Sequence, residues 1–487
     1  MFLGFRRVIA ALEPRYTLPS DSWLRKTLIP ELYDGLCKDL MNLMESASFV
    51  SCTTDTWSTA QCTDSLLSVT VHWVDADWVR RSALLAASPI VGSHTAENIK
   101  TVVTGVIAKW NLAGKVHVFV RDNAKNMTSG LRDAGVHSLP CLSHTLQLCV
   151  KRGLTSQRAV SDALAVGRHV ATHFSHSVLA KEKLESIQQT LSSVPERRII
   201  QDVSTRWNST YYMAQRLVEQ KRALILYAAD NTLSLPDANQ WMLLERSSAI
   251  LAPIERATKD VSAESSTASD VIPLVIGIKR ALQLLTNDAG VQTMKKELED
   301  DMDVRFANIT SEPLYAVATL VDPRYRGKLF SALELAAARQ WLIDQVTSVQ
   351  MPEGASPAAD DVQQPDAKRP RVDEILSPLD LLAADLLGGD TTSAQSGQLT
   401  AAEEVDAYLR QPNIPRQQSP LLWWKLNERN YVRVAEVARR YLSAPSTSVA
   451  SERLFSSAGE MYSDTRSRLA PERAEMLLFI NQNMKLF

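Results

Sequence analysis

Alternation of apolar and polar positions predicts a sheet in residues 47–154. Segments that alternate, or that run apolar between polar turns, predict strands at 47–55, 65–74, 78–88, 115–120 and 138–141. Between the third and fourth strands, apolar residues recur at helical spacing from Ile99 to Trp110, and Thr95 is suited to cap that helix. Two more helices are expected, at 123–133 and from about Thr145. The result is a mixed α/β sheet with helices on its faces.

The rest of the chain shows helical rather than strand periodicity. Residues 1–46 predict an N-terminal helical segment, and residues 155–350 predict a large all-α domain. Residues 351–400 begin with a stretch rich in Pro, Gly, Ser, Gln and Asp that lacks aromatic residues, which is typical of a disordered linker. Residues 401–487 again predict short amphipathic helices.

Composition is that of a soluble globular protein. Hydrophobic residues make up 45% and charged residues 22% of the 487 positions. The sequence has no apolar run close to the ~18 residues that span a bilayer, so no membrane partner is expected. Five cysteines, an odd number, argue for a reducing compartment and against a disulfide framework.

Charge is distributed unevenly along the chain. Residues 351–406 carry twelve acidic and three basic side chains, a net of −9, so a total of −2 leaves +7 on the remainder. A basic body is compatible with a polyanionic partner. Within the linker, Lys368, Arg369 and Arg371 form a basic cluster of nuclear-localisation type, or alternatively a solvated charge run in a loop.

Two aspartates stand where predicted strands end. Asp55 ends the first strand and Asp122 follows the fourth. The predicted strand order is that of an RNase H-like sheet, in which these two strands are neighbours and their ends meet at one edge. Paired carboxylates suit Mg²⁺ or Mn²⁺, and two such ions ~3.5–4 Å apart can catalyse phosphodiester transfer. Aspartates that only cap turns are the alternative interpretation, and a third carboxylate has to come from elsewhere.

Six short motifs resemble those of hAT-superfamily (hobo/Activator/Tam) transposases and of BED-zinc-finger proteins derived from them, in the same order. The motifs are ThrThrAspThrTrpSer (53–58), ArgAspAsnAlaLysAsnMet (121–127), CysLeuSerHisThrLeuGlnLeu (141–148), AspValSerThrArgTrpAsnSerThr (202–210), LeuValAspProArgTyrArg (320–326) and SerValAlaSerGluArgLeuPheSerSerAlaGly (448–459). The resemblance extends over nearly the whole chain.

This resemblance implies a catalytic and metal-binding triad of Asp55, Asp122 and Glu452, holding two Mg²⁺ or Mn²⁺ ions. It also implies an RNase H-like core interrupted by a helical insertion domain, with Glu452 on a helix that begins near Ser448. Without the resemblance, Glu452 would be read as a surface glutamate favoured by the helix dipole.

Other residues of these motifs are expected near the triad. The resemblance places Cys141 and His144 beside the active site, in packing or in contact with DNA, and zinc is not expected because a structural site needs four ligands. Arg206 and Trp207 are expected to contact DNA, with the tryptophan stacking on a flipped base. A tryptophan in a helical domain can also be an ordinary core residue.

The C-terminal region 401–487 resembles the hAT dimerisation region. Its apolar segments include Trp423, Trp424, Leu477 and Phe479, which can be interface anchors or core residues. Members of the family usually carry an N-terminal BED zinc finger that recognises DNA, and no Cys/His cluster of that type precedes Asp55. The chain departs from the family here and is expected to start after the finger, so sequence-specific DNA binding is not expected of residues 1–487.

The function expected from these patterns is metal-dependent cleavage and transfer of double-stranded DNA, from transposon ends to a target, by a nuclear homodimer or higher oligomer. The alternative is a domesticated, non-catalytic nuclear protein that binds DNA and regulates transcription. An RNase H-type nuclease acting on RNA–DNA hybrids would share the sheet but would leave the long helical region unexplained.

Overall fold

A mixed five-stranded sheet forms the centre of the protein in the computed structural model, which describes residues 3–58, 65–90, 92–203, 206–349, 399–461 and 470–487. Its strand order is β3-β2-β1-β4-β5, with β1–β2 and β2–β3 antiparallel and β1–β4 and β4–β5 parallel. The strands are β1 (Val50–Ser58), β2 (Ser65–Val74), β3 (Arg80–Pro89), β4 (Val116–Arg121) and β5 (Ser138–Pro140).

Helices make up most of the remaining described chain. Those around the sheet and leading out of it are α1 (Leu3–Leu12), α2 (Asp21–Trp23), α3 (Ile29–Glu45), α4 (Ala96–Lys109), α5 (Lys125–Asp133) and α6 (Leu142–Ser156). The helical region continues with α7 (Arg158–His176), α8 (Val178–Thr190), α9 (Trp207–Glu219), α10 (Lys221–Asp230), α11 (Ala238–Val261), α12 (Val271–Leu284), α13 (Gln292–Arg305), α14 (Pro313–Val321) and α15 (Ala332–Thr347). The C-terminal helices are α17 (Ala401–Leu409), α18 (Pro420–Asn427), α19 (Val432–Tyr441), α20 (Val449–Met461) and α21 (Pro471–Asn483).

The element order predicted for residues 47–154 is confirmed. All five strands and the three helices occur where expected, with shifts of a few residues at their ends. The last of these helices begins at Leu142 rather than near Thr145, because Cys141 is still extended (φ −62°, ψ 124°) and acts as the N-cap residue. Helix α17 begins at Ala401, directly after its N-cap residue Thr400. The side chains of Thr400 and Glu403 form a capping box. The linker and the basic cluster Lys368, Arg369 and Arg371 lie outside the described residues.

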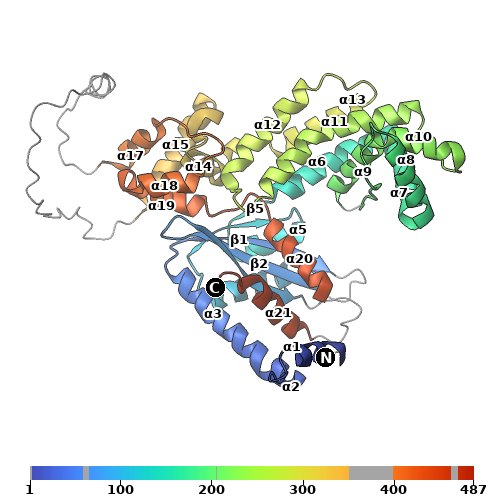
Figure 1. Ribbon diagram of the computed structural model, residues 1–487. Helices are drawn as coiled ribbons and strands as arrows, with labels where there is room; N and C mark the ends of the chain where they lie inside the picture. The colour runs from blue at the N-terminus through green and yellow to red at the C-terminus, as the bar shows by residue number, and fades with distance from the viewer. Residues whose placement is uncertain (1–2, 59–64, 91, 204–205, 350–398, 462–469) are drawn as a thin grey trace, which may run out of the picture.

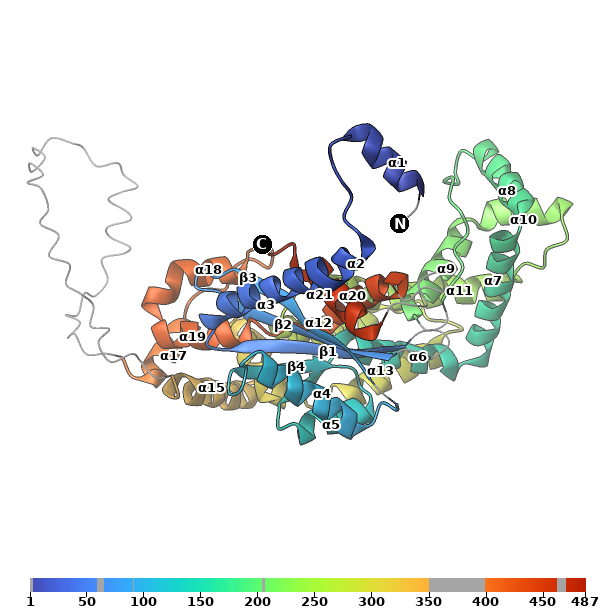
Figure 2. The same cartoon turned by 90° about the horizontal axis from the view of Figure 1, so that it is seen from below.

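Helices cover both faces of the sheet. Figure 2 shows α4 and α5 on one side of the sheet and α20 on the other. Helix α3 shares the α4 side, because its Leu36, Leu40 and Met44 belong to the same buried cluster as α4, and α21 runs along the β3 edge. The face toward α4 is apolar, with Cys52, Val69 and Phe119 in one buried cluster with Ile99 and Val103. The remaining helices, α6 to α19, form a layer beyond one end of the sheet (Figure 1).

On the sheet face beneath α20, this helix packs through an apolar cluster that joins Leu454 and Phe455 to Leu66 and Leu84 of the sheet, but the part formed by β1 is polar and buried. Along β1 the residues facing this side are Ser51, Thr53 and Asp55, and all are less than a tenth exposed. The hydroxyl of Ser51 hydrogen-bonds that of Ser443 (2.8 Å), and Thr53 pairs with Ser451 (3.3 Å). Buried hydroxyls need such partners, so the chain at 443–451 is held on the sheet by hydrogen bonds rather than by apolar contacts.

The outer edge of the sheet is closed by the last helix. The side chain of Asn483, fully buried at the end of α21, accepts a hydrogen bond from the backbone N–H of Leu84 (2.9 Å) and donates one to its carbonyl (2.8 Å). One amide group therefore takes the place of a neighbouring strand on β3, where an unpaired edge would otherwise expose backbone groups.

The motif at 320–326 has a structural role. Asp322 is fully buried at the end of α14, and it accepts hydrogen bonds from Ser269 (2.6 Å) and from Arg324 (2.7 Å). Arg324 also pairs with Asp270 (2.9 Å), which accepts a second bond from Tyr325 (2.6 Å). Because each buried charge has an opposite partner, this network ties α14 to the start of α12.

Two of the four proposed dimerisation residues lie in the core of the chain. Trp424 is fully buried, stacks on Trp78 and Tyr408 with ring centroids 5.8 and 5.0 Å apart, and donates its indole N–H to the carbonyl of Val321 (2.9 Å). Phe479 is 1% exposed. Both are covered within one chain, which favours a core role for them over a role as interface anchors. Trp423 and Leu477 are partly exposed.

Candidate active site

Asp55 is the innermost acidic residue of the candidate site. It lies on the polar face of β1, where its Oδ1 accepts the backbone N–H of Thr56 (2.8 Å), and it is 7% exposed. The pKa of Asp55 is raised to about 7, first by burial and then by the charges of Asp122 and Glu452, while His144 and the Thr56 N–H act in the opposite direction. The carboxylate is therefore costly to ionise unless a positive charge is placed beside it.

His144 reaches the same place from the start of α6. Helix α6 follows β5 directly, so its first turn lies at the ends of the parallel strands. The pKa of His144 is raised to about 9, first by the neighbouring Cys141 side chain and then by Asp55 and Glu452, while burial acts in the opposite direction. A protonated His144 thus supplies positive charge between the two carboxylates.

Glu452 enters the site in the first turn of α20. The backbone N–H of Ser448 donates to the sulfur of Cys141 (3.3 Å), and the N–H of Leu142 donates to the carbonyl of Ser446 (3.2 Å). These bonds join the start of α6 to the segment before α20. His144 Nε2 and Glu452 Oε1 consequently lie 3.9 Å apart, although 307 positions separate them.

The side chains of Asp55, His144 and Glu452 form one group of possible metal ligands. One ligand atom from each lies within 4.8 Å of the others. Two carboxylates suit Mg²⁺ or Mn²⁺, and an imidazole extends the choice toward transition metals. The donor set fits a divalent cation, whose charge would replace that of the His144 proton.

Asp122 lies beside this group without belonging to it. The β1–β4 register pairs Thr53 with Val120, so Asp55 and Asp122 each follow the paired residue by two positions, at the same level of neighbouring strands. The Asp122 Oδ1 accepts the N–H of Ala124 (3.1 Å) just before α5, and its charge acts on Asp55. Strands β1 and β4 are neighbours, as predicted. The contact with Ala124 is also the one expected of an aspartate that only caps a turn.

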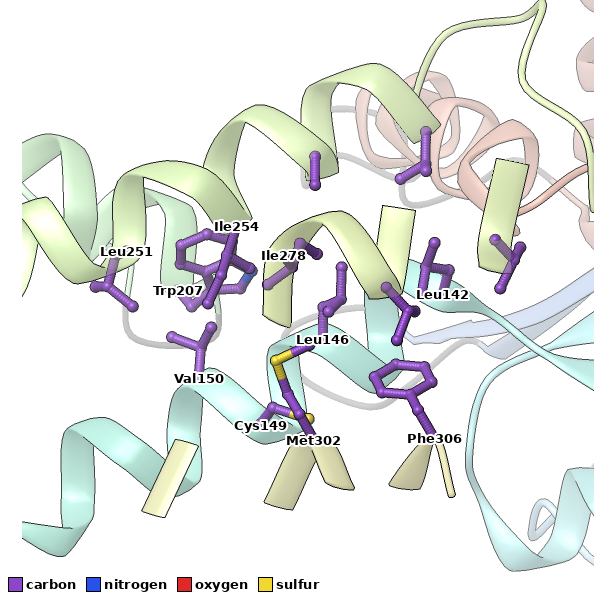
Figure 3. Packing of buried hydrophobic residues seen from close by; sticks show 14 of the residues in the cluster. Leu142, Leu146, Cys149, Val150, Trp207, Leu251, Ile254, Ile278, Met302 and Phe306 are labelled. Carbon is purple, nitrogen blue, oxygen red and sulfur yellow. The ribbon is translucent and has the colours of Figure 1, made fainter. Parts of the chain in front are cut away.

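Cys141 lies beside the candidate site, as expected, whereas Trp207 lies in the core of the helical layer. Cys141 is fully buried and joins the segments that carry His144 and Glu452. Trp207 packs in the core of the helical layer, where Figure 3 shows it beside Ile254 and Val150, and it is 7% exposed. The expectation that its ring stacks on a DNA base is therefore corrected to a core role. Arg206, directly before α9, is exposed.

The position of His144 between the two carboxylates is the feature of this group that the sequence does not predict. The CysXxxXxxHis spacing at 141–144 suggested a residue near the site, but not one within coordination distance of both acids. The sequence feature that indicates this position is the short strand β5, which directly precedes α6 and pairs with β4, the strand that Asp122 follows. Residues 443–451 carried a second signal, because four serines and a threonine are too many for an apolar contact with the sheet.

Metal binding to this group is expected to depend on pH through Asp55. Its pKa is raised from about 3.8 to about 7, so the contribution of the protonated carboxyl to stability is complete below about pH 3.8 and is lost as the pH rises through about 7. A cation competes with that proton, so its apparent affinity should fall roughly tenfold for each pH unit below 7. Thermal unfolding with Mn²⁺ should therefore show a larger stabilisation at pH 8 than at pH 6.

The control for this measurement is Asp55→Asn, which has no carboxyl group to titrate. Its Mn²⁺ response should be small, with a weaker dependence on pH than in the unmodified protein. Equal Mn²⁺ stabilisation of the unmodified protein at pH 6 and pH 8 would show that Asp55 is not a ligand.

Three family models match successive parts of the chain. Residues 53–138 match the ZBED1 RNase-like domain, and residues 139–249 match the ZBED1 RNase-like helical domain. Residues 404–484 match the hAT family C-terminal dimerisation region. The first two therefore contain Asp55, Asp122 and His144, and the third contains Glu452.

Curated relatives are similar along almost the full chain. The human protein named zinc finger BED domain-containing protein 4 is 30% identical over 499 residues, covering 99% of this chain and 42% of the relative. A putative AC transposase of Zea mays is 24% identical, covering 97% and 61%. A putative transcriptional regulator, tpeD, of Talaromyces stipitatus is 24% identical, covering 95% and 57%.

The chain spans about half the length of the curated relatives it matches. Within the described residues, none of the helices combines the length and apolar character needed to cross a bilayer. The three matched regions occur in one order in a single chain, and the relatives include both transposases and BED proteins. The protein is therefore a relative of hAT-family transposases and BED zinc finger proteins that carries the hAT C-terminal dimerisation region.

Proposed function

We propose that the protein is a hAT-type DNA transposase, which cleaves and transfers DNA strands with the help of divalent metal ions. The observation that carries this proposal is the convergence of Asp55, His144 and Glu452 from segments far apart in the sequence. A buried aspartate with a raised pKa, beside a second carboxylate, is a typical arrangement of functional sites. The strand order β3-β2-β1-β4-β5 supports an RNase H-like core for this site.

Each residue of the site has a proposed role. Asp55 and Glu452 hold Mg²⁺ or Mn²⁺, and Asp122, at the level of Asp55 on the next strand, contributes to a second ion. Bound ions of this kind activate an attacking oxygen and stabilise a leaving one in phosphodiester chemistry. His144, as an imidazolium, balances the two carboxylates when no ion is bound. When an ion takes over that charge, the neutral imidazole retains one N–H, which donates a hydrogen bond toward a DNA phosphate.

The proposed assembly is a nuclear homodimer that acts on double-stranded DNA. The hAT dimerisation region at 404–484 supports self-association. On its surface, Leu422 and Leu426 of α18 are more than half exposed, so they replace Trp424 as the apolar residues available to a second copy. The transposase and BED relatives support the nuclear location and the DNA partner.

The proposal is tested by Mn²⁺-dependent nicking and joining of a supercoiled plasmid by the purified chain. Removing Mn²⁺ with EDTA should abolish the reaction, and Asp122→Ala should reduce its rate by about 10²-fold or more, since losing a ligand to one of two ions weakens transition-state stabilisation by several kcal/mol. Asp133→Ala, at the exposed end of α5, is the matched control. Equal rates for the unmodified protein and Asp122→Ala would reject the two-ion site.

A second candidate function is a non-catalytic nuclear protein that binds DNA and regulates transcription. One observation favours it, namely that Asp122 contacts the start of α5 and stands outside the group of three ligands. The similarity to BED proteins and to a putative transcriptional regulator agrees with this alternative. The plasmid assay separates the two, because a regulator would bind the DNA without metal-dependent cleavage.

A further inference from the structure

A polar cavity lies on the same face of the sheet as Asp55, on the other side of α20. It has a volume of about 200 Å³ and lies between β2, β3, the end of α11 and the start of α20. Its lining includes Thr70, His72, Arg80 and Arg453, but none of Asp55, His144 and Glu452. The cavity is therefore separate from the proposed active site.

Arg80 is a cation in the wall of this cavity without a carboxylate partner. Its guanidinium donates to three backbone carbonyls, those of Glu264 (2.6 Å), Ser266 (2.8 Å) and Ser443 (3.2 Å). Among the described residues, its Nε is buried without a hydrogen-bond partner, and no ion pair involves it. Burial lowers the pKa of Arg80 to about 10, while the charges of Asp270 and Glu264 act in the opposite direction.

His72 adds a second unsatisfied group to the same wall. It is 5% exposed, and its Nε2 finds no hydrogen-bond partner in the described part of the chain. Burial, followed by the charge of Arg80, lowers the pKa of His72 well below its usual value, so the ring is neutral and one nitrogen can donate. Buried polar atoms without partners beside a cavity are normally satisfied by water or by a ligand.

The rim of the cavity is basic. Arg453, which follows Glu452 near the start of α20, pairs with Glu264 (2.8 Å) and donates to the carbonyl of Ser262 (2.9 Å), which leaves other guanidinium donors available. Arg81 also lines the cavity and pairs with Asp75, which is not part of the lining. Arg453 and Arg81 each have a carboxylate partner, so among the described residues Arg80 is the arginine of the lining that lacks an ion pair.

We propose that this cavity binds a phosphate group, through Arg80, His72 and Arg453. Phosphate offers several acceptors to guanidinium donors and compensates their charge, which water does not do. The volume is below the roughly 300–1,000 Å³ of pockets that enclose drug-sized ligands, so it fits one phosphate group rather than a whole nucleotide. The site does not depend on the proposed transposase function. Its phosphate comes either from free inorganic phosphate or from the backbone of a DNA strand.

The first arm of the test is calorimetric titration of the full chain with inorganic phosphate, without divalent metal and at constant ionic strength set with chloride. The unmodified protein should show saturable binding. Arg453→Gln should weaken it by about fivefold or more, and Glu264→Gln should tighten it by about threefold, as expected for partly exposed charge pairs. Arg410→Gln, an exposed arginine on another helix, should bind phosphate like the unmodified protein.

The second arm identifies the source of the phosphate by competition with a short single-stranded oligonucleotide. If the oligonucleotide displaces phosphate from the unmodified protein but binds Arg453→Gln more weakly, the source is the DNA backbone. If it leaves phosphate binding unchanged, the source is free phosphate, and either result supports the site. Absence of saturable phosphate binding, or equal binding by the unmodified protein, Arg453→Gln and Glu264→Gln, would overturn the proposal. DNA cleavage is not measured, so this failure is distinct from failure of the proposed function.

Discussion

Replacing Glu452 with glutamine is expected to lower metal-dependent DNA cleavage by about 10³-fold or more, because the amide removes a charged ligand that supplies several kcal/mol of transition-state stabilisation. The fold should be unaffected, since the Glu452 carboxylate is partly exposed and its ion-pair contact is with His144 at 3.9 Å. The measurement is the rate of Mn²⁺-dependent plasmid nicking, with circular dichroism to verify the fold.

Glu472→Gln is the matched control, because Glu472 is also an acid in the first turn of a helix, α21, and is exposed. Its cleavage rate should equal that of the unmodified protein. If Glu452→Gln and Glu472→Gln cleave at the same rate, Glu452 is not a ligand, and the helix-dipole interpretation of this glutamate is the correct one.

The second large effect is expected from Trp424→Ala, which should lower the apparent free energy of unfolding by about 3–5 kcal/mol, the usual range for removing a buried tryptophan. The change leaves a cavity between Trp78 and Tyr408, and it strips the fully buried carbonyl of Val321 of its indole donor. Urea unfolding monitored by circular dichroism measures the loss, which should not vary with protein concentration.

Two further variants test the same prediction even if Trp424→Ala does not fold. Trp424→Phe retains an aromatic ring and loses the hydrogen bond, so its cost should be about 1–3 kcal/mol. Val432→Ala, at the start of the next helix, α19, and 46% exposed, should leave stability nearly unchanged. If the Trp424→Ala protein is as stable as the unmodified protein but is monomeric by sedimentation, Trp424 is a residue of the dimer interface and not of the core.

The strands and helices could be predicted from the sequence because their periodicities are local. Asp55 and Asp122 were placed correctly on neighbouring strands, since the order of elements in 47–140 leaves few topologies. The direction of the Asp122 carboxylate could not be predicted in the same way, because it depends on a turn contact with the N–H of Ala124. Strand order determines which residues adjoin, but not where each side chain points.

The burial of individual aromatic residues could not be predicted from local sequence patterns either. Trp207 and Trp424 both lie in short helices with aromatic neighbours, and aromatic residues are enriched in cores and in interfaces alike. Their burial is decided by partners such as Ile254 and Trp78, which are distant in sequence. The cavity beside Arg80 was missed for a similar reason, since its walls come from four separate parts of the chain.

The amide of Asn483 on the edge of β3 has a consequence for how the protein is made. Strands β1 to β5 are synthesised by residue 140, but their polar face is covered only by 443–451 and their edge is closed only by Asn483. Ribosomes add ~5–20 residues per second, so the sheet spends tens of seconds or longer incomplete. Folding of this domain should therefore be post-translational, and chaperones that shield unpaired strands should associate with the nascent chain.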